Sequence, residues 1–381
     1  MNVRWTLVFA ACVAATAVAQ DKKDAGKNGK PADKAAEKAA PRPIDRVNRT
    51  GGKPSVKGTV TAETCVEVVI RRENNTEERI PVDDVLSVDR GDAPEAYRRG
   101  VAAFGAGDYP NAVQLLTRAL TENADKAWLG EAANFYLGEA SRLSGKHDDA
   151  VKAYDAVVAA KGDSRFLAPA RLGQARAQIA ASRFPDAEKT LNGFLAEAEA
   201  KKIPRRHVLK AREMIGKNLE AQNRFGEAVG AYDAVVREAG NLAKDDPGVA
   251  ERIRTAQRAK ASCLIREKKY DEAARLLDGL AADKSPAGEA MALTGRGESL
   301  LAQGKFDDAR ATLARVIGAR FHDDHELARA MLLMAKTLLE IDKEGKDASA
   351  AKTAQSYLTD LVEQHAASEF SKEARMLKDK R

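Results

Sequence analysis

One segment of this sequence carries side chains that could bind a metal ion, His322-Asp323-Asp324-His325. Histidines at positions i and i+3 can share one face of a helix, and imidazole and carboxylate groups are common zinc ligands. The same segment also lies at a predicted turn between helices, where an aspartate typically caps the helix that follows, here one beginning near Glu326. We therefore interpret these residues as a helix start, and we predict no metal site and no cofactor.

The sequence lacks the spacing patterns that form common active sites. No G-x-S-x-G, P-loop, H-E-x-x-H or C-x-x-C motif occurs, and no G-x-G-x-x-G follows a predicted strand. His147, His207 and His365 have no adjacent nucleophile, and Cys263 falls in the middle of a predicted helix. We therefore expect the protein not to be an enzyme and to have no small-molecule substrate.

A repeated six-residue pattern predicts the secondary-structure elements of most of the chain. It begins with a small or turn-forming residue in most copies, has an aromatic residue or histidine in third place and ends in alanine. The closing alanines are separated by 38, 37, 41, 45 and 36 residues, and a recurrence at such a spacing indicates a repeat array. The six copies are G-D-Y-P-N-A (107–112), G-K-H-D-D-A (145–150), S-R-F-P-D-A (182–187), N-R-F-G-E-A (223–228), K-K-Y-D-E-A (268–273) and G-K-F-D-D-A (304–309).

Each pattern is flanked by residues that predict two helices in close contact. Apolar side chains follow the alanine after four and seven residues, for example Tyr154 and Val157. A glycine stands in the preceding helix at Gly138, Gly216 and Gly297, where a missing side chain lets the partner helix come close. An antiparallel bundle with heptad spacing is the alternative, but no apolar pattern recurs at 3.5 residues.

The order Leu-Gly, then Ala, an aromatic residue and Ala resembles the tetratricopeptide repeat (TPR) family, and the layout resembles an exported bacterial TPR protein. The resemblance is strongest over 93–319. It implies an all-α solenoid of antiparallel helix pairs, the TPR right-handed superhelix, with helices or turns longer than in the plain 34-residue motif. For residues 92–381 we expect six clear repeats, a degenerate seventh and a C-terminal capping helix.

A small β module is expected before the helices, in residues 55–91. Apolar residues there recur with a period of two, and Asn74-Asn75 is a turn signal, so the pattern predicts four short strands. The segment resembles a small SH3-like or Sm-like β module. We expect it to cap the solenoid or to pack on its first helix.

The first 54 residues predict export followed by a spacer. Residues 1–19 have a short n-region with Arg4, an apolar run and an A-V-A cleavage site, which is typical of a signal peptide and implies the periplasm or cell surface. A lipidated Cys12 or a retained signal is the alternative. Residues 20–54, rich in Lys, Ala and Pro, predict a disordered linker. We favour a solvated spacer; the alternative is that its lysines contact anionic membrane lipid or cell-wall polymer.

The charge distribution argues against a nucleic-acid partner. The formal net charge is +6, and residues 20–60 alone carry 11 Lys and Arg against 5 Asp and Glu. The repeats are therefore near neutral and lack the basic face that nucleic-acid binding requires. Cys65 and Cys263 could form one disulfide, but two buried thiols are the favoured interpretation.

The TPR resemblance implies a protein partner, because the first helices of TPR repeats line a groove that holds a segment of a partner. We therefore predict a non-enzymatic protein-protein interaction scaffold or adaptor in the bacterial cell envelope. In repeats three to five the groove positions predict a basic stripe of Arg176, Lys210, Lys217 and Arg258, interrupted by Glu213, that selects an acidic partner segment. A solvated helix face is the alternative interpretation of these charges. The alternative is a cell-wall or polysaccharide binding accessory protein that uses the β module. The predicted groove residues are Tyr97, Phe135, Glu139, Arg142, Arg176, Lys210, Glu213, Lys217, Arg258 and Glu298.

Overall fold

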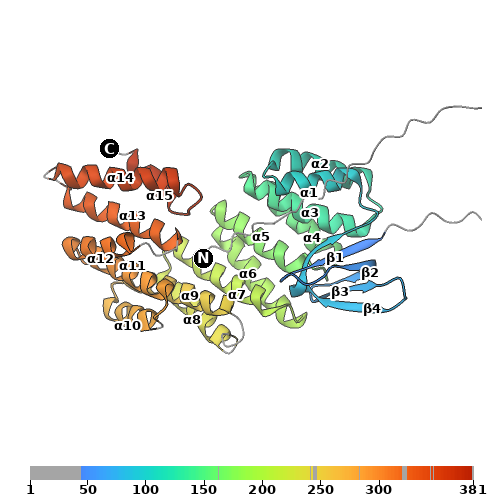
Figure 1. Cartoon of the computed structure of the whole chain (residues 1–381), viewed down its shortest axis with the longest axis horizontal. Helices are drawn as coiled ribbons and strands as arrows, with labels where there is room; N and C mark the ends of the chain where they lie inside the picture. Colours follow the sequence, from blue (N-terminus) through green and yellow to red (C-terminus); the bar gives the residue numbers. More distant parts are fainter. Residues whose placement is uncertain are drawn as a thin grey trace, which may run out of the picture. The chain divides into compact units, whose positions relative to one another are not determined.

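The computed structural model describes residues 44–161, 163–240, 242, 247–282, 284–319, 324–343, 345 and 347–379. The predicted signal peptide, Cys12 and most of the predicted linker lie outside these residues. Within them five strands precede fifteen helices (Figure 1), which confirms the expected helical repeat fold with a small β unit before it. The described residues form two compact units, an N-terminal unit that ends at Gly173 and a C-terminal unit that begins at Gln174.

The N-terminal unit starts with an antiparallel five-stranded sheet in the strand order β4-β3-β2-β1-β5. Its interior consists of alternating apolar side chains, among them Val47, Val68, Ile70 and Ile80, each at most 1% exposed. The bounds are β1 (Asp45–Arg49), β2 (Val56–Glu63), β3 (Glu67–Arg71), β4 (Glu77–Pro81), the 3-10 turn η1 (Val82–Asp84) and β5 (Val85–Asp89).

Strand β1 corrects the predicted boundary of the β module, because it lies within the range expected to be linker, and the sheet has five strands rather than four. Val47 is fully buried between β2 and β5. The buried Asp45 carboxylate accepts hydrogen bonds from the backbone nitrogens of Val60 (2.9 Å) and Gly91 (3.0 Å). One valine and one aspartate thus order a segment whose polar composition indicates a linker.

The sheet is joined to the helices of the same unit by polar contacts from the end of β2. The backbone nitrogen of Cys65 donates to Asp163 Oδ1 at 2.9 Å, and Glu63 forms ion pairs with Arg90 and Arg165. Burial raises the pKa of Glu63, but the two arginines outweigh it and hold this pKa below its usual value. The sheet therefore contacts the connection between the fourth and fifth helices as well as the segment that leads into the first.

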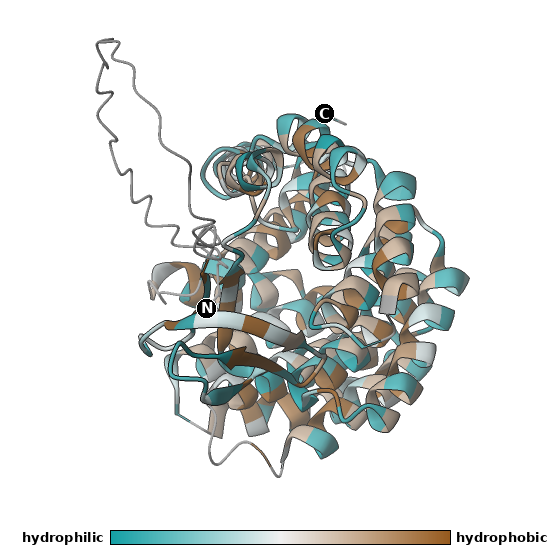
Figure 2. Cartoon of the chain, turned by 90° about the vertical axis from the view of Figure 1, so that its right-hand side faces the viewer, coloured by the Kyte–Doolittle hydropathy of each residue, from teal (hydrophilic) through white to brown (hydrophobic). Residues whose placement is uncertain are grey.

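The helices form successive antiparallel pairs, in which odd-numbered helices from α1 to α13 come first and even-numbered helices second. Sequence neighbours pack together from α1 to α4 and from α6 to α15, and the first helices α9, α11 and α13 also stack on one another. Most helices in Figure 2 carry both teal and brown segments, as amphipathic packing requires. The bounds are α1 (Glu95–Gly105), α2 (Tyr109–Glu122), α3 (Ala127–Leu143), α4 (His147–Lys161), α5 (Leu167–Ala180), α6 (Phe184–Ala200), α7 (Arg205–Ala221), α8 (Phe225–Gly240), α9 (Pro247–Arg266), α10 (Tyr270–Ala282), α11 (Pro286–Ala302), α12 (Phe306–Gly318), α13 (Asp324–Ile341), α14 (Ala348–Gln364) and α15 (Ser371–Lys378).

The six-residue pattern is the turn between the two helices of a pair. Its first residue has a positive φ in every copy, and in Gly304 this angle is 74°. The next backbone nitrogen, that of Lys305, donates to the carbonyl of Leu300 at 2.9 Å, which is the hydrogen bond that ends a helix in a Schellman motif. Glycine adopts this conformation without strain, whereas Lys268 adopts it at a cost.

The last residue of the pattern and the upstream glycine bring the two helices together. All six alanines are fully buried. At each predicted glycine the side chain four residues after the alanine fills the space that a Cβ atom would need, at 2.7 Å or less. This confirms the predicted close approach. The pairs are Gly138 with Tyr154, Gly216 with Tyr232, and Gly297 with Leu313.

The seventh pair, α13 and α14, keeps the packing of the repeat although its turn sequence differs. Ala354, Leu358 and Leu361 are fully buried and follow the same spacing of four and seven residues. Asp347 caps α14 by accepting a hydrogen bond from the nitrogen of Ala350 at 2.9 Å. No helix among the described residues is both long and apolar enough to cross a membrane.

Candidate functional site

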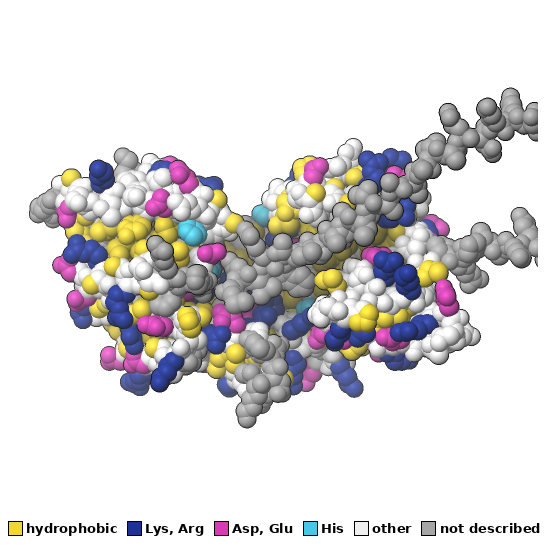
Figure 3. Space-filling model, in the orientation of Figure 1, with side chains coloured by type: hydrophobic (Ala, Val, Ile, Leu, Met, Phe, Trp, Pro, Cys, Tyr) yellow, Lys and Arg dark blue, Asp and Glu magenta, His cyan; other side chains and the backbone are white. Residues whose placement is uncertain are grey.

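The ten predicted groove residues all lie on first helices of pairs. In the N-terminal unit they come from α1 and α3, and in the C-terminal unit from α5, α7, α9 and α11. Basic and acidic side chains are interspersed over the face shown in Figure 3. We call the C-terminal group the first-helix face and define it by Arg176, Lys210, Glu213, Lys217, Arg258 and Glu298, with the side chains that contact them.

In the N-terminal unit the predicted aromatic residues belong to a packed cluster. Tyr97 is 9% exposed, and its ring centroid lies 5.5 Å from that of Trp128 and 6.4 Å from that of Tyr136. Phe135 packs on Phe166 at 5.0 Å. Burial raises the pKa of Tyr97. Tyr97 therefore presents little surface to a partner and serves mainly to pack the first two repeats.

Glu139 and Arg142 are joined to each other and to the second helix of their repeat. The Tyr154 hydroxyl donates to Glu139 Oε1 at 2.5 Å, and Arg142 Nη2 donates to Glu139 Oε2 at 2.7 Å. Burial and the Glu139 carboxylate raise the pKa of Tyr154. The same arrangement recurs in the C-terminal unit, where the Tyr232 hydroxyl donates to Glu220. These carboxylates anchor buried tyrosines and are not free to bind a ligand.

Cations gather around His207 on α7. Burial, followed by Arg206, Arg252 and Arg176, lowers the pKa of His207 to about 4. Glu213 compensates part of this charge, because it accepts from Lys210 Nζ at 3.1 Å and from Arg252 Nη1 at 2.7 Å. No ion pair of Arg176 occurs within the described residues. This part of the first-helix face therefore has a surplus of positive charge.

The part of the first-helix face at α9 and α13 is instead neutralised by a buried carboxylate. Glu326 is fully buried and lies 2.9 Å from Arg258 Nη1 and 3.5 Å from Arg329 Nη1. Burial alone would raise the pKa of Glu326, but Arg258, a hydrogen bond from His325 and Arg329 hold it well below its usual range. Arg329 also forms an ion pair with Glu298.

His325 connects α13 to the segment before α15. Its Nε2 atom lies 2.9 Å from Glu369 Oε1, and its Nδ1 atom lies 3.4 Å from Glu326 Oε1. Burial lowers the pKa of His325, but the hydrogen bonds to Glu326 and Glu369 outweigh it and raise this pKa above its usual value. Lys217 on α7 approaches the same Glu369 at 3.9 Å. His325 thus acts in an ion-pair network.

These contacts give carboxylate partners to three cations of the expected basic stripe, which consists of Arg176, Lys210, Lys217 and Arg258 and is interrupted by Glu213. Lys210, Lys217 and Arg258 each have a carboxylate partner, and the cation surplus is confined to the surroundings of His207. Glu213 was itself a predicted groove residue, but sequence analysis missed the partners of Lys217 and Arg258 because they lie on other segments of the chain. The only sequence pattern that could have indicated such a partner is two opposite charges at positions i and i+3 of one predicted helix, as for Glu326 and Arg329. The residues that were missed altogether are Arg252, Arg329 and Glu369, whereas His207, His325 and Glu326 were named only in other roles.

The candidate metal and thiol groups have structural roles where they are described. Asp324 and His325 belong to the first turn of α13, whereas His322 and Asp323 lie outside the described residues. Among the described side chains no group of three potential ligands could hold a metal ion. Cys65 and Cys263 are both buried and are not joined in a disulfide. Burial and then Glu220 raise the pKa of Cys263, so its thiol is a poor nucleophile.

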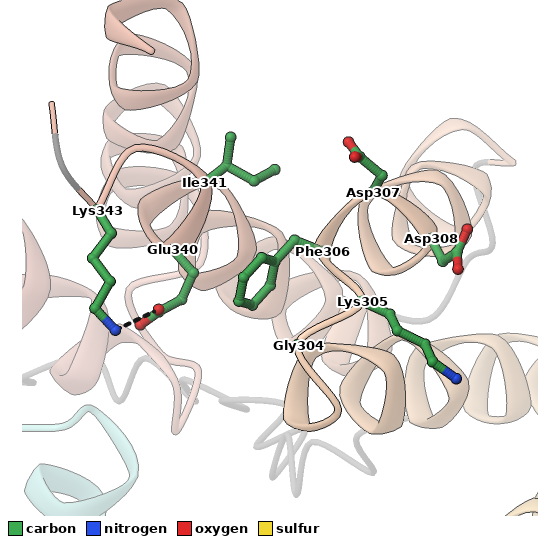
Figure 4. A pocket seen from close by; sticks show the side chains of 8 residues that line it. All are labelled: Gly304, Lys305, Phe306, Asp307, Asp308, Glu340, Ile341 and Lys343. Atoms are coloured by element: carbon green, nitrogen blue, oxygen red, sulfur yellow. Dashed lines mark hydrogen bonds and ion pairs between the residues drawn. The ribbon is translucent and has the colours of Figure 1, made fainter. Parts of the chain in front are cut away.

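A pocket of about 660 Å³ lies at the turns of the sixth and seventh pairs. Figure 4 shows that the Phe306 ring points toward Glu340 and Ile341 of α13, while Asp308 and Lys305 point away from it. Glu340 forms an ion pair with Lys343 at 3.0 Å. The aromatic position of the repeat thus packs against the next pair, and the pocket is a consequence of repeat stacking.

Comparisons with known proteins agree with this architecture. The model of the tetratricopeptide repeat family matches residues 97–165, 213–289 and 294–366, which together make up more than half of the chain. The protein therefore belongs to the tetratricopeptide repeat family. Members of this family generally are scaffolds for protein-protein interaction and typically are not enzymes.

One solved structure of a bacterial TPR protein has the same fold, and a second is reported for comparison. A tetratricopeptide repeat protein from Parabacteroides merdae is 16% identical, with 75% of this chain and 96% of that chain covered and a TM-score of 0.54. The C-terminal part of a TPR repeat-containing protein from Cytophaga hutchinsonii is 9% identical, with 73% and 98% covered and a TM-score of 0.43. A search of the curated proteins finds no significant match. The SH3-like or Sm-like character of the sheet stays a prediction.

Proposed function

We propose that this protein is a non-enzymatic scaffold or adaptor that binds a segment of a protein partner on the first-helix face of the C-terminal unit. The observation that carries the proposal is the cation surplus around His207. Arg176, Arg206 and Arg252 come from α5, α7 and α9 and act on one partly buried imidazole. Keeping these like charges together costs free energy, and an anionic ligand would recover it.

An acidic partner segment fits this surplus. Its carboxylates would meet Arg176 first, because Lys210 and Arg252 are already paired with Glu213. Farther along the face an incoming carboxylate would have to compete with Glu326 for Arg258, which is unfavourable because Glu326 is fully buried. We therefore expect the acidic residues of the partner to bind near α5 and α7.

We further propose that the protein acts in the bacterial cell envelope, at the periplasm or cell surface. The support is the predicted signal peptide in residues 1–19 and the spacer composition that follows it. Fractionation of cells that express the full chain tests this location, with a chain lacking residues 2–19 as control. Recovery of the full chain with cytoplasmic markers would contradict it.

The partner can be sought by capture from an envelope extract with the full chain. Arg176→Glu is the informative variant, because Arg176 has no ion pair within the described part of the chain. Lys189→Glu on α6 is the matched control, since it makes the same charge change on an exposed second-helix position. Arg258→Glu is unsuitable because it would place a carboxylate beside buried Glu326.

We expect a protein captured by the wild type and by Lys189→Glu to bind Arg176→Glu about three- to tenfold more weakly, since exposed charges contribute up to about 1 kcal/mol each. The difference should shrink at high salt. Equal binding by all three chains would move the binding surface elsewhere. Co-sedimentation with cell-wall polymer in place of a protein partner would favour the alternative of a polysaccharide-binding accessory protein.

A further inference from the structure

The segment between α14 and α15 reaches across the C-terminal unit. Glu369 lies before α15 yet pairs with Lys217 on α7. Three complete helix pairs, from α9 to α14, separate this segment from the pair α7 and α8 along the chain. A contact of this range is unusual in a repeat array, where each repeat mainly contacts its neighbours. The segment therefore occupies part of the first-helix face.

The segment has a defined conformation that directs Glu369 and Phe370. The Ser368 nitrogen donates to the His365 carbonyl at 2.8 Å, and the Ser371 hydroxyl donates to the Ala366 carbonyl at 3.0 Å. The Phe370 nitrogen bonds to the Ser368 hydroxyl at 3.2 Å. Both side chains are thus presented from a turn that has hydrogen bonds of its own.

The two side chains make complementary contacts with one imidazole. Glu369 Oε1 lies 2.9 Å from His325 Nε2, and the Phe370 ring centroid lies 5.2 Å from that of His325 at an interplanar angle of 64°. Lys217 lies on the other side of the Glu369 carboxylate. The hydrogen bond from His325 lowers the pKa of Glu369 to about 2, against a smaller opposing effect of burial.

We propose that Glu369 and Phe370 are an intramolecular occupant of the first-helix face, and that the partner segment which displaces them also carries a carboxylate next to an aromatic ring. This inference rests on the proposed function. The groups that face the Glu369 carboxylate are His325 and Lys217, with Arg258 farther away. Glu326 of α13 and Glu220 of α7 are the acidic groups nearby, and both already have hydrogen-bond partners.

The ion pair of Glu369 with Lys217 is the weak part of this contact. The Lys217 and Glu369 side chains are each 54% exposed, and such exposed pairs contribute up to about 1 kcal/mol. Helix α15 also has contacts of its own, because it packs on α14 and Lys336 pairs with Glu373 at 2.7 Å. An internal segment competes at an effective concentration in the millimolar range. A partner that binds more tightly than this can therefore replace it.

A labelled peptide with the sequence of residues 366–372, A-A-S-E-F-S-K, is the probe. Its binding to the full chain is measured by fluorescence anisotropy and compared with a control peptide, A-A-S-Q-A-S-K. The double variant Glu369→Gln with Phe370→Ala should bind the probe at least about fivefold more tightly than the wild type, because the internal competitor is gone. Adding Lys217→Glu should abolish this gain.

Glu363→Gln on α14 is the matched control, because it removes an exposed carboxylate near the segment and should leave probe binding as in the wild type. Equal binding of the probe by the wild type and the double variant, or equal binding of both peptides, would overturn the inference. Hydrogen exchange of α15 checks the fold of the double variant. If α15 loses protection, Glu369→Gln alone is compared with the wild type, and unchanged affinity is again the refuting result.

The extract capture separates this inference from the proposed function. Probe binding that depends on Glu369 and Phe370, without any captured protein partner, would support occupation of the face by the internal segment but would contradict the scaffold role. A partner captured equally well by the wild type and the double variant would support the scaffold role and refute competition by the internal segment.

Discussion

Replacing His207 with glutamine should make the protein more resistant to mild acid. Burial and the neighbouring Arg206, Arg252 and Arg176 lower the pKa of His207 from 6.5 to about 4 in the folded protein. The unfolded chain therefore binds a proton at His207 between these values while the folded chain does not. Stability contributed by neutral His207 is complete above pH 6.5 and is lost as the pH falls toward 4.

The size of this effect follows from the shift. One pKa unit corresponds to about 1.4 kcal/mol, so at pH 5 the folded state loses about 2 kcal/mol relative to pH 7.5 through this one residue. Urea unfolding at several pH values measures the loss. His207→Gln should remove about 2 kcal/mol of the difference in unfolding free energy between pH 7.5 and pH 5, whatever its effect at neutral pH.

A titration of the His207 ring by NMR tests the cause as well as the magnitude. Arg206→Gln should raise the pKa of His207, because Arg206 is the strongest of the three charge contributions. Arg205→Gln removes an adjacent exposed charge and serves as the control. A pKa of His207 at or above 6.5 in the wild type, or equal acid sensitivity of the wild type and His207→Gln, would refute the argument and the cation surplus on which the proposed function rests.

Three further predictions concern the repeat itself. Gly216→Ala should lower the unfolding free energy by about 1 to 3 kcal/mol, because its Cβ would lie 2.5 Å from the Tyr232 ring. Gly230→Ala on α8 should instead stabilise the protein by about 0.5 to 1 kcal/mol, because no atom lies within 4 Å of the added Cβ. Urea unfolding of both variants measures the difference, and equal effects would contradict the packing. Ala228→Leu should cost about 1 to 3 kcal/mol at a fully buried helix contact, and a thermal melt as high as that of exposed Ala221→Leu would remove this alanine from the contact. Lys268→Gly should raise the melting temperature, because Lys268 has a φ of 62°. Lys305→Gly is the control and should not raise it, because Lys305 has a φ of −88°. A lower melting temperature for Lys268→Gly would mean that the strain is absent.

The repeat architecture was predictable because it depends on contacts that are local in the sequence. Gly304 and the fully buried Ala309 belong to one turn, and Leu313 follows at the spacing that fills the space beside Gly297. These positions require a particular residue size or backbone angle. A requirement of this kind recurs in each copy, so the spacing of alanines alone indicates the fold.

The charge arrangement could not be predicted, because each ion pair joins helices that are far apart in the chain. The sequence predicts exposed basic positions at both Arg258 and Lys217. In the structure Arg258 is paired with the buried Glu326, whereas Lys217 is paired with the half-exposed Glu369. Tyr97 likewise occupies a groove position by spacing and is buried by neighbouring rings. The sign of a surface is set by partners that only the tertiary structure brings together.

The sequence by itself determined the helix pairs, their turns and their close packing, since glycine, alanine and apolar spacing act within one repeat or between neighbours. Only the tertiary structure decided that β1 is a strand, because that depends on burial of Val47 between two other strands. It also decided that cations gather around His207 and that Glu369 pairs with Lys217 of α7. Short-range steric requirements produce a periodic pattern of residue types in the sequence, whereas the pairing of charged residues depends on distances that exist only in the folded chain.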